Sequence, residues 1–217
     1  GFSIYQNIEQ VSKLIPENKP DDQMYVALFR GPDTPIEDIP EWNPSYCEGI
    51  RVIIRYSEID KSLKFCRALA EKGYKVFVQP MLTMRYTDNQ LQKLIDESND
   101  FGAYALYLVD SYGYMESHDV LNLSRRFDEG LLENIFLGFH AHNNMNLAFS
   151  NVLTFVEQIS NRSIIVDSTI MGMGQGAGNI QTELLIPYLN NKHAGAYDYC
   201  AVLDACEIIE AYWKDNL

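Results

Sequence analysis

Leu137–Phe149 reads LGFHAHNNMNLAF and carries the pattern that decides the fold. The apolar run Ile135–His142 is typical of a strand buried on both faces, as in a parallel sheet. The apolar spacing of Asn144–Ile159 then predicts a helix. Two histidines end the predicted strand, and two asparagines follow directly at the start of the helix. The stretch therefore predicts one strand–helix unit with polar groups at the carboxyl end of its strand.

The same unit recurs along the chain. Further strands are predicted at Met24–Arg30, Ile50–Tyr56, Lys75–Leu82, Tyr104–Asp110 and Ser163–Ile170. Helices are predicted at Ile4–Ile15, Glu58–Lys72, Asp88–Ser98, Ser117–Phe127, Ile180–Asn190 and Tyr197–Trp213. Such alternation predicts an α/β protein, either a doubly wound sheet or an eight-stranded barrel. The sequence has no GxGxxG after its first predicted strand and no GxxxxGK[ST], which disfavours a dinucleotide site and a P-loop.

The bulk composition narrows the class of protein. The 217 residues are 47% apolar, enough for one large domain with a substantial core. The formal charge of −13 argues against nucleic acid or an anionic membrane as a partner. No apolar run is long enough for a transmembrane helix. The four cysteines show no CxxC spacing and are expected to be reduced, so a cytoplasmic location is predicted.

His140 and His142 suggest a metal site. Residues i and i+2 of a strand point to the same face, so the two imidazoles are expected to project together. Neutral imidazoles in that arrangement suit a divalent transition metal. Asn143, directly after them, can orient a ligand or cap the next helix. The alternative is a pair of histidines with ordinary hydrogen bonds.

The stretch Met171–Asn179 (MGMGQGAGN) places four glycines between the last predicted strand and a helix. Backbone N–H groups of such a loop can approach an anion closely. The alternative is a flexible helix entry with Asn179 as the N-cap.

Other polar residues end the predicted strands, where parallel α/β folds bind ligands. Arg55 and Gln79 can hold a substrate carboxylate or hydroxyl, although Arg55 can equally close a buried ion pair. Asp110 and Asp167 can be a ligand, a base, a partner of a ligating histidine, or a helix cap. Five tyrosines are predicted to pack while their hydroxyls contact water: Tyr25, Tyr104, Tyr107, Tyr112 and Tyr114.

Three stretches together resemble a known family: GFHAHNNMNLA, YLVDSYGYM and DSTIMGMGQGAGNIQTELL. They look like the HMG-CoA-lyase-like metal-dependent aldolases and acyl-transferring synthases, most of all the 4-hydroxy-2-oxovalerate aldolases. The resemblance implies a TIM (β/α)8 barrel. It also implies that His140 and His142 bind a divalent metal, Mn²⁺ or Mg²⁺ or else Co²⁺ or Zn²⁺. Asn179 matches a position at or near that metal.

The resemblance also implies substrate contacts. Ser111 matches a residue near the keto acid, and Gly172 and Gly174 are expected to shape the lid of the site. With Arg55, Gln79 and Asn143 from the strand ends, these residues form the predicted substrate-binding set. Arg55 departs from the family, where a histidine is more usual, and this bears on the second substrate.

A second departure concerns the family's first strand, which ends in an LRDG-like motif with a metal-binding Asp and an Arg. Arg30-Gly31-Pro32-Asp33 follows a strand that matches the family's third. We therefore expect the barrel to lack its first strand and most of its second here, with about 40 residues upstream, one strand–helix repeat, carrying the Arg and the base. Residues 1–192 are expected to form the barrel, and 193–217 a C-terminal helix packing on it or starting a further region.

The predicted activity is a carbon–carbon lyase that cleaves or forms a 4-hydroxy-2-oxo acid from pyruvate and an aldehyde through a metal-stabilised enolate. The alternatives are an enzyme of the same superfamily that uses acyl-CoA, and a non-catalytic barrel that kept the fold. A homo-oligomer is compatible with the resemblance.

Overall fold

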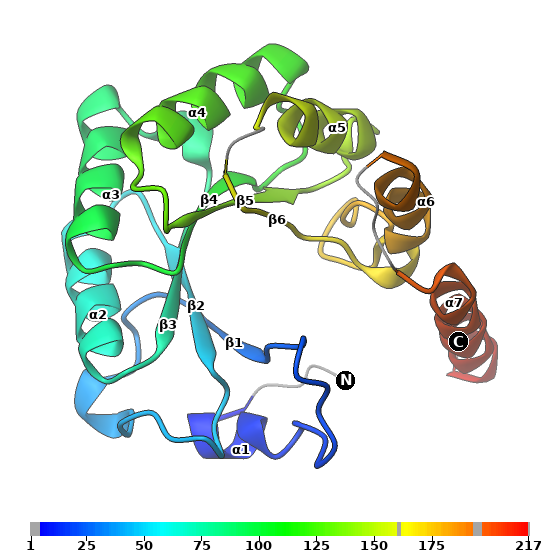
Figure 1. The fold of residues 1–217 in the computed structure, drawn as a ribbon, viewed down its shortest axis with the longest axis horizontal. Helices are drawn as coiled ribbons and strands as arrows, with labels where there is room; N and C mark the ends of the chain where they lie inside the picture. Colours follow the sequence, from blue (N-terminus) through cyan, green and yellow to red (C-terminus); the bar gives the residue numbers. More distant parts are fainter. Residues whose placement is uncertain (1–4, 160–161, 193–196, 217) are drawn as a thin grey trace.

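A computed structural model describes residues 5–159, 162–192 and 197–216 of the chain. Six strands form one sheet in sequential order, and every pair of neighbours is parallel (Figure 1). They are β1 (Val26–Phe29), β2 (Gly49–Ile54), β3 (Lys75–Pro80), β4 (Ala105–Asp110), β5 (Phe136–Ala141) and β6 (Ile164–Val166). The predicted strands are thereby confirmed, each within a few residues of its ends. Within the described part of the chain, β1 and β6 pair on one side only.

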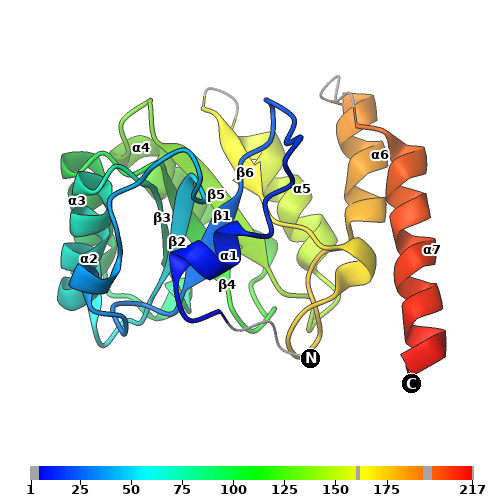
Figure 2. The same ribbon diagram turned by 90° about the horizontal axis from the view of Figure 1, so that it is seen from below.

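The helices are α1 (Ile8–Ser12), α2 (Ile59–Glu71), α3 (Asp88–Asp100), α4 (Ser117–Gly130), α5 (Ala148–Gln158), α6 (Thr182–Lys192) and α7 (Tyr199–Asn216). Short 3₁₀ turns lie at Ile36–Asp38, Thr83–Arg85 and Ile170–Gly172. Helices α2 to α5 line the outer, convex side of the curved sheet (Figures 1 and 2). A doubly wound sheet has helices on both faces, so the sequential order and one-sided cover identify a barrel-type arrangement.

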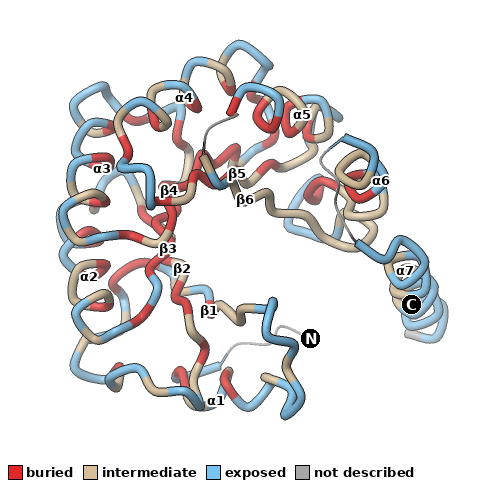
Figure 3. Tube along the Cα trace, viewed as in Figure 1, coloured by how far each residue is buried: buried red, intermediate tan, exposed pale blue. Residues whose placement is uncertain are grey.

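Strand alternation divides the core into two clusters. Ile50, Val52 and Ile54 of β2 are fully buried and belong to the large cluster between strands and helices. Phe77, Ala105, Tyr107 and Val109 form a second cluster, on the inner face of the sheet. Buried residues accordingly follow the strands and the sheet-facing sides of the helices (Figure 3). Burial on both faces explains why the strands are near-continuous apolar runs.

Aromatic rings fill the amino-terminal end of the inner face. Tyr104 lies with its ring centroid 4.9 Å from those of both Phe77 and Phe136. One layer further along, the Tyr107 ring lies over Gly138, where a Cβ atom would come within 2.5 Å of that ring. The glycine before the two histidines is therefore needed for packing, and the polar layer begins above this aromatic floor.

Local hydrogen bonds explain where helix starts were predicted correctly and where not. Helix α3 begins at Asp88, as predicted, and Thr87 caps it in a capping box with Gln90. Helix α4 begins at Ser117, as predicted, because Glu116 and Asp119 form a reciprocal capping box there. Helix α5 begins four residues later than predicted, since Asn146 takes a left-handed conformation with φ of 57°.

The two ends of the described chain differ from the rest. α1 is a short helix, and residue 4 of the predicted longer helix lies outside the described residues. At the other end, α7 lies alongside α6 (Figure 2) and is mostly exposed (Figure 3). The boundary predicted at residues 192 and 193 meets residues 193–196, also outside the described set. No described helix has the length and apolar character needed to span a bilayer.

Candidate metal centre

His140 of β5 and His142, which directly follows the strand, face each other at the carboxyl end of the sheet. Nε2 of His140 lies 3.3 Å from Nε2 of His142, and the two rings are nearly perpendicular. Gly138, His140 and His142 alternate with the buried outward-facing Leu137, Phe139 and Ala141. The strand period thus brings both Nε2 atoms to one point on the inner face, as predicted.

Asp167, just after β6, contacts the His140 ring on the nitrogen that faces away from His142. Its Oδ2 lies 2.8 Å from Nδ1 of His140 and also contacts Nη1 of Arg51, while its Oδ1 accepts a 3.0 Å bond from Nη2 of Arg51. Burial alone would raise the pKa of Asp167, but the His140 hydrogen bond and the Arg51 charge hold that pKa below its usual value. Asp167 is therefore a charged partner of a histidine, one of the roles predicted for it.

Arg51 is the residue that the sequence analysis missed. It comes from the middle of β2 and reaches Asp167 across the inner face, with its guanidinium carbon 4.5 Å from the centre of the Tyr107 ring. An arginine flanked by buried Ile50 and Val52 was the available signal, because alternation turns it away from the helices and into the barrel.

Tyr107 corrects a prediction. Its hydroxyl was expected to contact water, but the side chain is completely buried. The hydroxyl lies 2.6 Å from Nη2 of Arg51 and 3.4 Å from Oδ1 of Asp167. Burial, followed by the charge of Asp167, raises the pKa of this hydroxyl. The reason for the difference is that Tyr107 faces the barrel interior, whereas Tyr112 and Tyr114 lie on the exposed loop after β4.

Asn179 lies opposite His142. The two residues form an isolated antiparallel bridge, and Asn143 N–H donates to Gly178 O at 2.9 Å. Directly opposed residues of an antiparallel pair project to the same face, so the Asn179 side chain is on the side of the imidazoles. Its Nδ2 donates to Met173 O at 2.9 Å, while its buried Oδ1 has no hydrogen-bond partner among the described residues.

The glycine loop shapes itself around Asn179. A Cβ atom on Gly174 would lie 2.4 Å from Asn179 Nδ2, and one on Gly178 would lie 2.2 Å from Gly172 O. Gly172 and Gly178 also take φ values of +67° and +79°, in the left-handed region that favours glycine. Asn179 is not the N-cap of a helix, since α6 begins at Thr182.

Several backbone N–H groups of this loop donate to acceptors in the loop or in α6. Gly172, Gly178 and Asn179 donate to the carbonyls of Thr169, Gln175 and Gly172, and the Met171 N–H donates to Oε2 of Glu183. These four donors are therefore engaged within the loop or by α6 and are not available to an anion. The loop instead holds one amide side chain beside two imidazoles.

Charge at the site is set by burial. Burial lowers the pKa of His142 and raises the pKa of Asp110. For His142, the neighbouring His140 lowers the pKa further, while the backbone carbonyls of Gln175 and Gly178 oppose this by hydrogen bonding. Asp110 accepts from the N–H groups of Tyr114 and Met115 and so caps its own loop. A lowered pKa keeps His142 neutral, the form that binds a metal.

Arg55 lies at the rim of the sheet. Its guanidinium pairs with Asp33 and Glu58, each at 2.8 Å, and its side chain remains 40% exposed. The ion pair foreseen for Arg55 therefore exists but is exposed, because the residue follows the end of β2. Because the Arg55 guanidinium already pairs with two carboxylates, fewer of its N–H donors are available to a substrate carboxylate than its position at the strand end suggested.

The remaining predicted substrate residues mostly have structural partners. Ser111 Oγ accepts the Leu82 N–H at 2.9 Å, and Asn143 Oδ1 accepts the Ala148 N–H at 3.2 Å, at the start of α5. Gln79, on the inner side of β3 in register with Ile53, is buried, and its Oε1 has no hydrogen-bond partner within the described set.

Backbone strain gathers in the loops after the strands. Among the described residues, those other than glycine with positive φ are Leu82, Asn146 and Met171, in the loops after β3, β5 and β6. Each costs of order 1–3 kcal/mol, which must be offset by surrounding structure. This strain lies at the same end of the sheet as the histidine pair.

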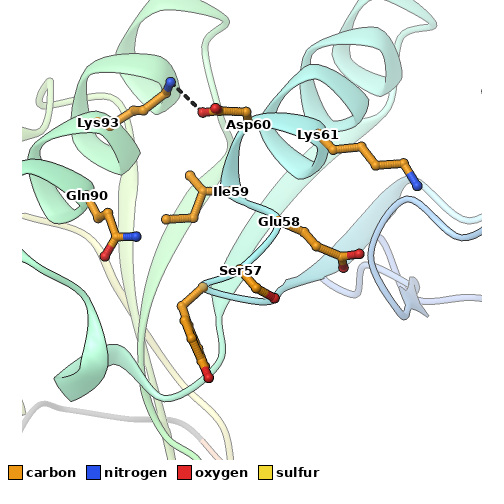
Figure 4. A pocket seen from close by; sticks show the side chains of 8 residues that line it. Ser57, Glu58, Ile59, Asp60, Lys61, Gln90 and Lys93 are labelled. Atoms are coloured by element: carbon orange, nitrogen blue, oxygen red, sulfur yellow. Dashed lines mark ion pairs between the residues drawn. The ribbon is translucent and has the colours of Figure 1, made fainter.

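A surface hollow of about 460 Å³ lies elsewhere, between the starts of α2 and α3 (Figure 4). Asp60 of α2 and Lys93 of α3 form an ion pair at its edge, and Ile59 and Gln90 also line it (Figure 4). None of the residues around the histidine pair lines it. We assign it no role.

The donors at the histidine pair fit a divalent ion. Two imidazole nitrogens at 3.3 Å and an unpartnered amide oxygen on the same face suit a metal of mixed nitrogen and oxygen preference. In the described ranges no group of three or more His, Cys, Asp or Glu side chains could hold a metal ion. This follows from the geometry, because Asp167 binds the far side of the His140 ring and Asn179 is an amide.

Comparison with known proteins gives a consistent result. The family model described as HMGL-like matches residues 53–211. The 4-hydroxy-2-oxovalerate aldolase of Bacillus thuringiensis is 30% identical over 193 residues, which are 88% of this chain and 54% of the relative. The chain thus spans about half the length of the curated relatives that it matches first.

Solved structures share the fold. The N-terminal domain of a candidate aldolase from Bacteroides vulgatus superposes with a TM-score of 0.79 at 25% identity, over 89% of this chain and 64% of that one. The hydroxymethylglutaryl-CoA lyase of Pseudomonas aeruginosa gives a TM-score of 0.73 at 17% identity, over 94% and 74%. Both support the barrel architecture predicted from the sequence.

Proposed function

Since the chain belongs to the HMGL-like family and its sheet is part of a TIM-type barrel, we propose that it acts as a divalent-metal-dependent carbon–carbon lyase of the pyruvate-aldolase type. The observation that carries this proposal is the 3.3 Å contact between His140 Nε2 and His142 Nε2, with Asn179, whose Oδ1 is unpartnered among the described residues, bridged to His142 through the backbone. The relatives named 4-hydroxy-2-oxovalerate aldolase support the choice of a 2-oxo acid and an aldehyde as substrates.

These three residues would hold the ion. It would act as a Lewis acid on the keto and carboxylate oxygens of the 2-oxo acid and stabilise the enolate charge that develops when the carbon–carbon bond breaks. Mn²⁺ or Mg²⁺ is the predicted metal. An aspartate as a further ligand, and an arginine and a base, remain predictions drawn from the family resemblance.

The chain's own residues contribute position and charge. Burial keeps His142 neutral, the carboxylate of Asp167 faces Nδ1 of His140, and the glycine loop fixes Asn179. The aromatic floor of Phe77, Tyr104 and Phe136 closes the amino-terminal end of the inner face, so ligands would enter from the carboxyl end. Gln79 Oε1, buried and unpartnered within the described set, is a candidate acceptor for a substrate hydroxyl.

Exchange of the pyruvate methyl protons tests this function without knowledge of the aldehyde. The full-length protein with Mn²⁺ and pyruvate is incubated in D₂O, quenched with chelator, and deuterium in pyruvate is measured by mass spectrometry. We expect metal-dependent exchange that the His140→Ala variant loses. His118→Ala is the matched control, because His118 is exposed on α4 and remote in sequence from the pair.

The outcomes separate the candidates. Exchange in the wild type and the control, but not in His140→Ala, supports formation of the pyruvate enolate, and an aldehyde screen follows. Bound metal without exchange would contradict pyruvate as the substrate and favour another 2-oxo acid or acyl transfer. Neither metal nor exchange would overturn the proposal in favour of a non-catalytic barrel.

A further inference from the structure

Behind His140, a chain of buried polar contacts crosses the inner face of the sheet. It begins at Tyr107 on β4, includes Arg51 on β2 and Asp167 after β6, and ends at Nδ1 of His140 on β5. Three side chains from separate parts of the chain are thus linked to one imidazole nitrogen on β5. Nothing in the proposed chemistry requires Arg51 or Tyr107 to contact a substrate.

We propose that Asp167, held by Arg51, is a positioning residue that fixes His140 as the Nδ1–H tautomer and so directs the lone pair of Nε2 toward His142 and Asn179. This inference rests on the proposed metal site. It extends that proposal by naming residues that act through a ligand rather than on it.

The tautomer follows from the contacts. A carboxylate accepts hydrogen bonds and cannot donate one, so the 2.8 Å contact between Asp167 Oδ2 and His140 Nδ1 requires the proton on Nδ1. In the neutral ring, Nε2 is then the acceptor. That nitrogen faces His142 Nε2 at 3.3 Å, which is where a metal ligand is needed.

Arg51 determines which way the carboxylate points. It contacts both oxygens of Asp167, and a two-point contact fixes the plane of the carboxylate. The Arg51 guanidinium in turn lies over the rings of Phe77 and Tyr107, with its carbon 5.8 and 4.5 Å from their centres. The hydroxyl of Tyr107 completes the support. Asp167 therefore presents one fixed oxygen to His140 rather than a rotating group.

The Asp167→Asn variant tests the tautomer directly. With its amide oxygen retained by Nη2 of Arg51, its NH₂ group would face His140 and donate to Nδ1, moving the ring proton to Nε2. Histidine side-chain ¹⁵N–¹H NMR of the metal-free protein at pH 8, with His140→Gln for assignment, reports the tautomer. We expect Nδ1–H in the wild type and Nε2–H in Asp167→Asn.

Metal affinity provides the second readout. Titration calorimetry with Mn²⁺ alone is expected to show a 10- to 100-fold weaker site in Asp167→Asn, the usual cost of losing such a partner. Asp33→Asn is the matched control, because Asp33 also pairs with an arginine of the β2 region but lies at the rim. It should leave both the tautomer and the affinity unchanged.

The wild-type tautomer tests the proposal even if Asp167→Asn fails to fold. An Nε2–H tautomer in the wild type, or unchanged tautomer and affinity in a folded Asp167→Asn, would overturn it. A protein with the Nδ1–H tautomer but no Mn²⁺ binding would confirm the role of Asp167 and contradict the metal site instead, so the two failures are distinguishable.

Discussion

Arg51 and Arg55 lie four residues apart at β2, and each pairs with an aspartate, but the two pairs have different surroundings. Arg51 and Asp167 are 19% and 15% exposed in their side chains, and they meet inside the sheet beneath the histidine pair. Arg55 and Asp33 are 40% and 55% exposed and lie at the rim. The inner pair is coupled to His140, whereas the outer pair is surrounded by water. Both pairs join an arginine to an aspartate, so their different burial, and not their residue types, distinguishes the pair that contacts His140.

The largest expected effect is the loss of stability when the Arg51–Asp167 pair is broken. Asp167→Ala leaves the partly buried Arg51 charge without its carboxylate partner, so we expect a loss of about 3 kcal/mol in the free energy of unfolding, the lower end for a buried pair. Asp33→Ala removes an exposed partner that solvent replaces, and should cost less than about 1 kcal/mol. Urea unfolding followed by circular dichroism measures both.

Equal losses in the two variants would contradict the distinction between inner and rim pairs. Replacing the inner pair on both sides, as Arg51→Met with Asp167→Ala, should recover part of the stability, because no unpaired charge then remains inside. The Nδ1–H tautomer of His140 would still be lost. That double variant separates the pair's contribution to stability from its effect on the histidine.

The two arginines also show which features of the fold and the site can be predicted from the sequence. Continuous apolar runs and polar strand ends predicted the parallel sheet and the direction of His140 and His142, because those depend on local periodicity. The barrel class came from the family resemblance, since the pattern alone left a doubly wound sheet open. Attention to strand ends, however, selected Arg55 and passed over Arg51 in the middle of β2. The partner of Arg51 is 116 residues away in sequence, and no local pattern encodes that contact.

Tyr107 and Asn179 show the same limit. Tyr107 was treated like the loop tyrosines, although it follows the inward-facing register that also contains Phe77 and Gly138. Asn179 was assigned to the metal by family resemblance alone. Its antiparallel bridge to His142, and the missing Cβ of Gly174 against its amide, arise from loop geometry that residue spacing does not specify.

Two glycines of the loop after β6 give a second comparison, because Gly174 contacts Asn179 whereas Gly176 lies in open space. Gly174→Ala would place a Cβ 2.4 Å from Asn179 Nδ2 and displace that side chain, so we expect Mn²⁺ affinity to fall about tenfold, or about 1.4 kcal/mol. Gly176 has nothing within 4 Å of its Cβ position. Gly176→Ala should only strain a residue with φ of +62°, without loss of metal.

Calorimetric titration of both glycine variants with Mn²⁺ checks this expectation. If Gly176→Ala weakened the metal site as much as Gly174→Ala, general stiffness of the loop rather than contact with Asn179 would be responsible. Retained affinity in Gly174→Ala would show that Asn179 is not a ligand.

The smallest expected effect is on acid stability. The pKa values of Asp167 and Asp33 are both held below the ordinary value, Asp33 chiefly by its hydrogen bond with Arg55. A lowered folded pKa gives stability that is present above the unfolded value of about 3.9 and is lost as pH falls through the folded value. One aspartate contributes at most about 1.4 kcal/mol per pH unit.

We therefore expect Asp167→Asn and Asp33→Asn each to flatten the decline of unfolding free energy between pH 5 and pH 2, relative to the wild type. Urea unfolding at a series of pH values measures the two slopes. A steeper decline in Asp167→Asn than in the wild type would show that the pKa of Asp167 is raised in the folded state, against the effect of Arg51.

The central claim is that His140 and His142 bind one divalent ion, and metal titration of the full-length protein tests it most directly. Calorimetry with Mn²⁺ compares the wild type with the double variant His140→Ala, His142→Ala, and with His118→Ala as control. We predict one site in the wild type and in His118→Ala, and no binding in the double variant. Unchanged Mn²⁺ binding in the double variant would contradict the account.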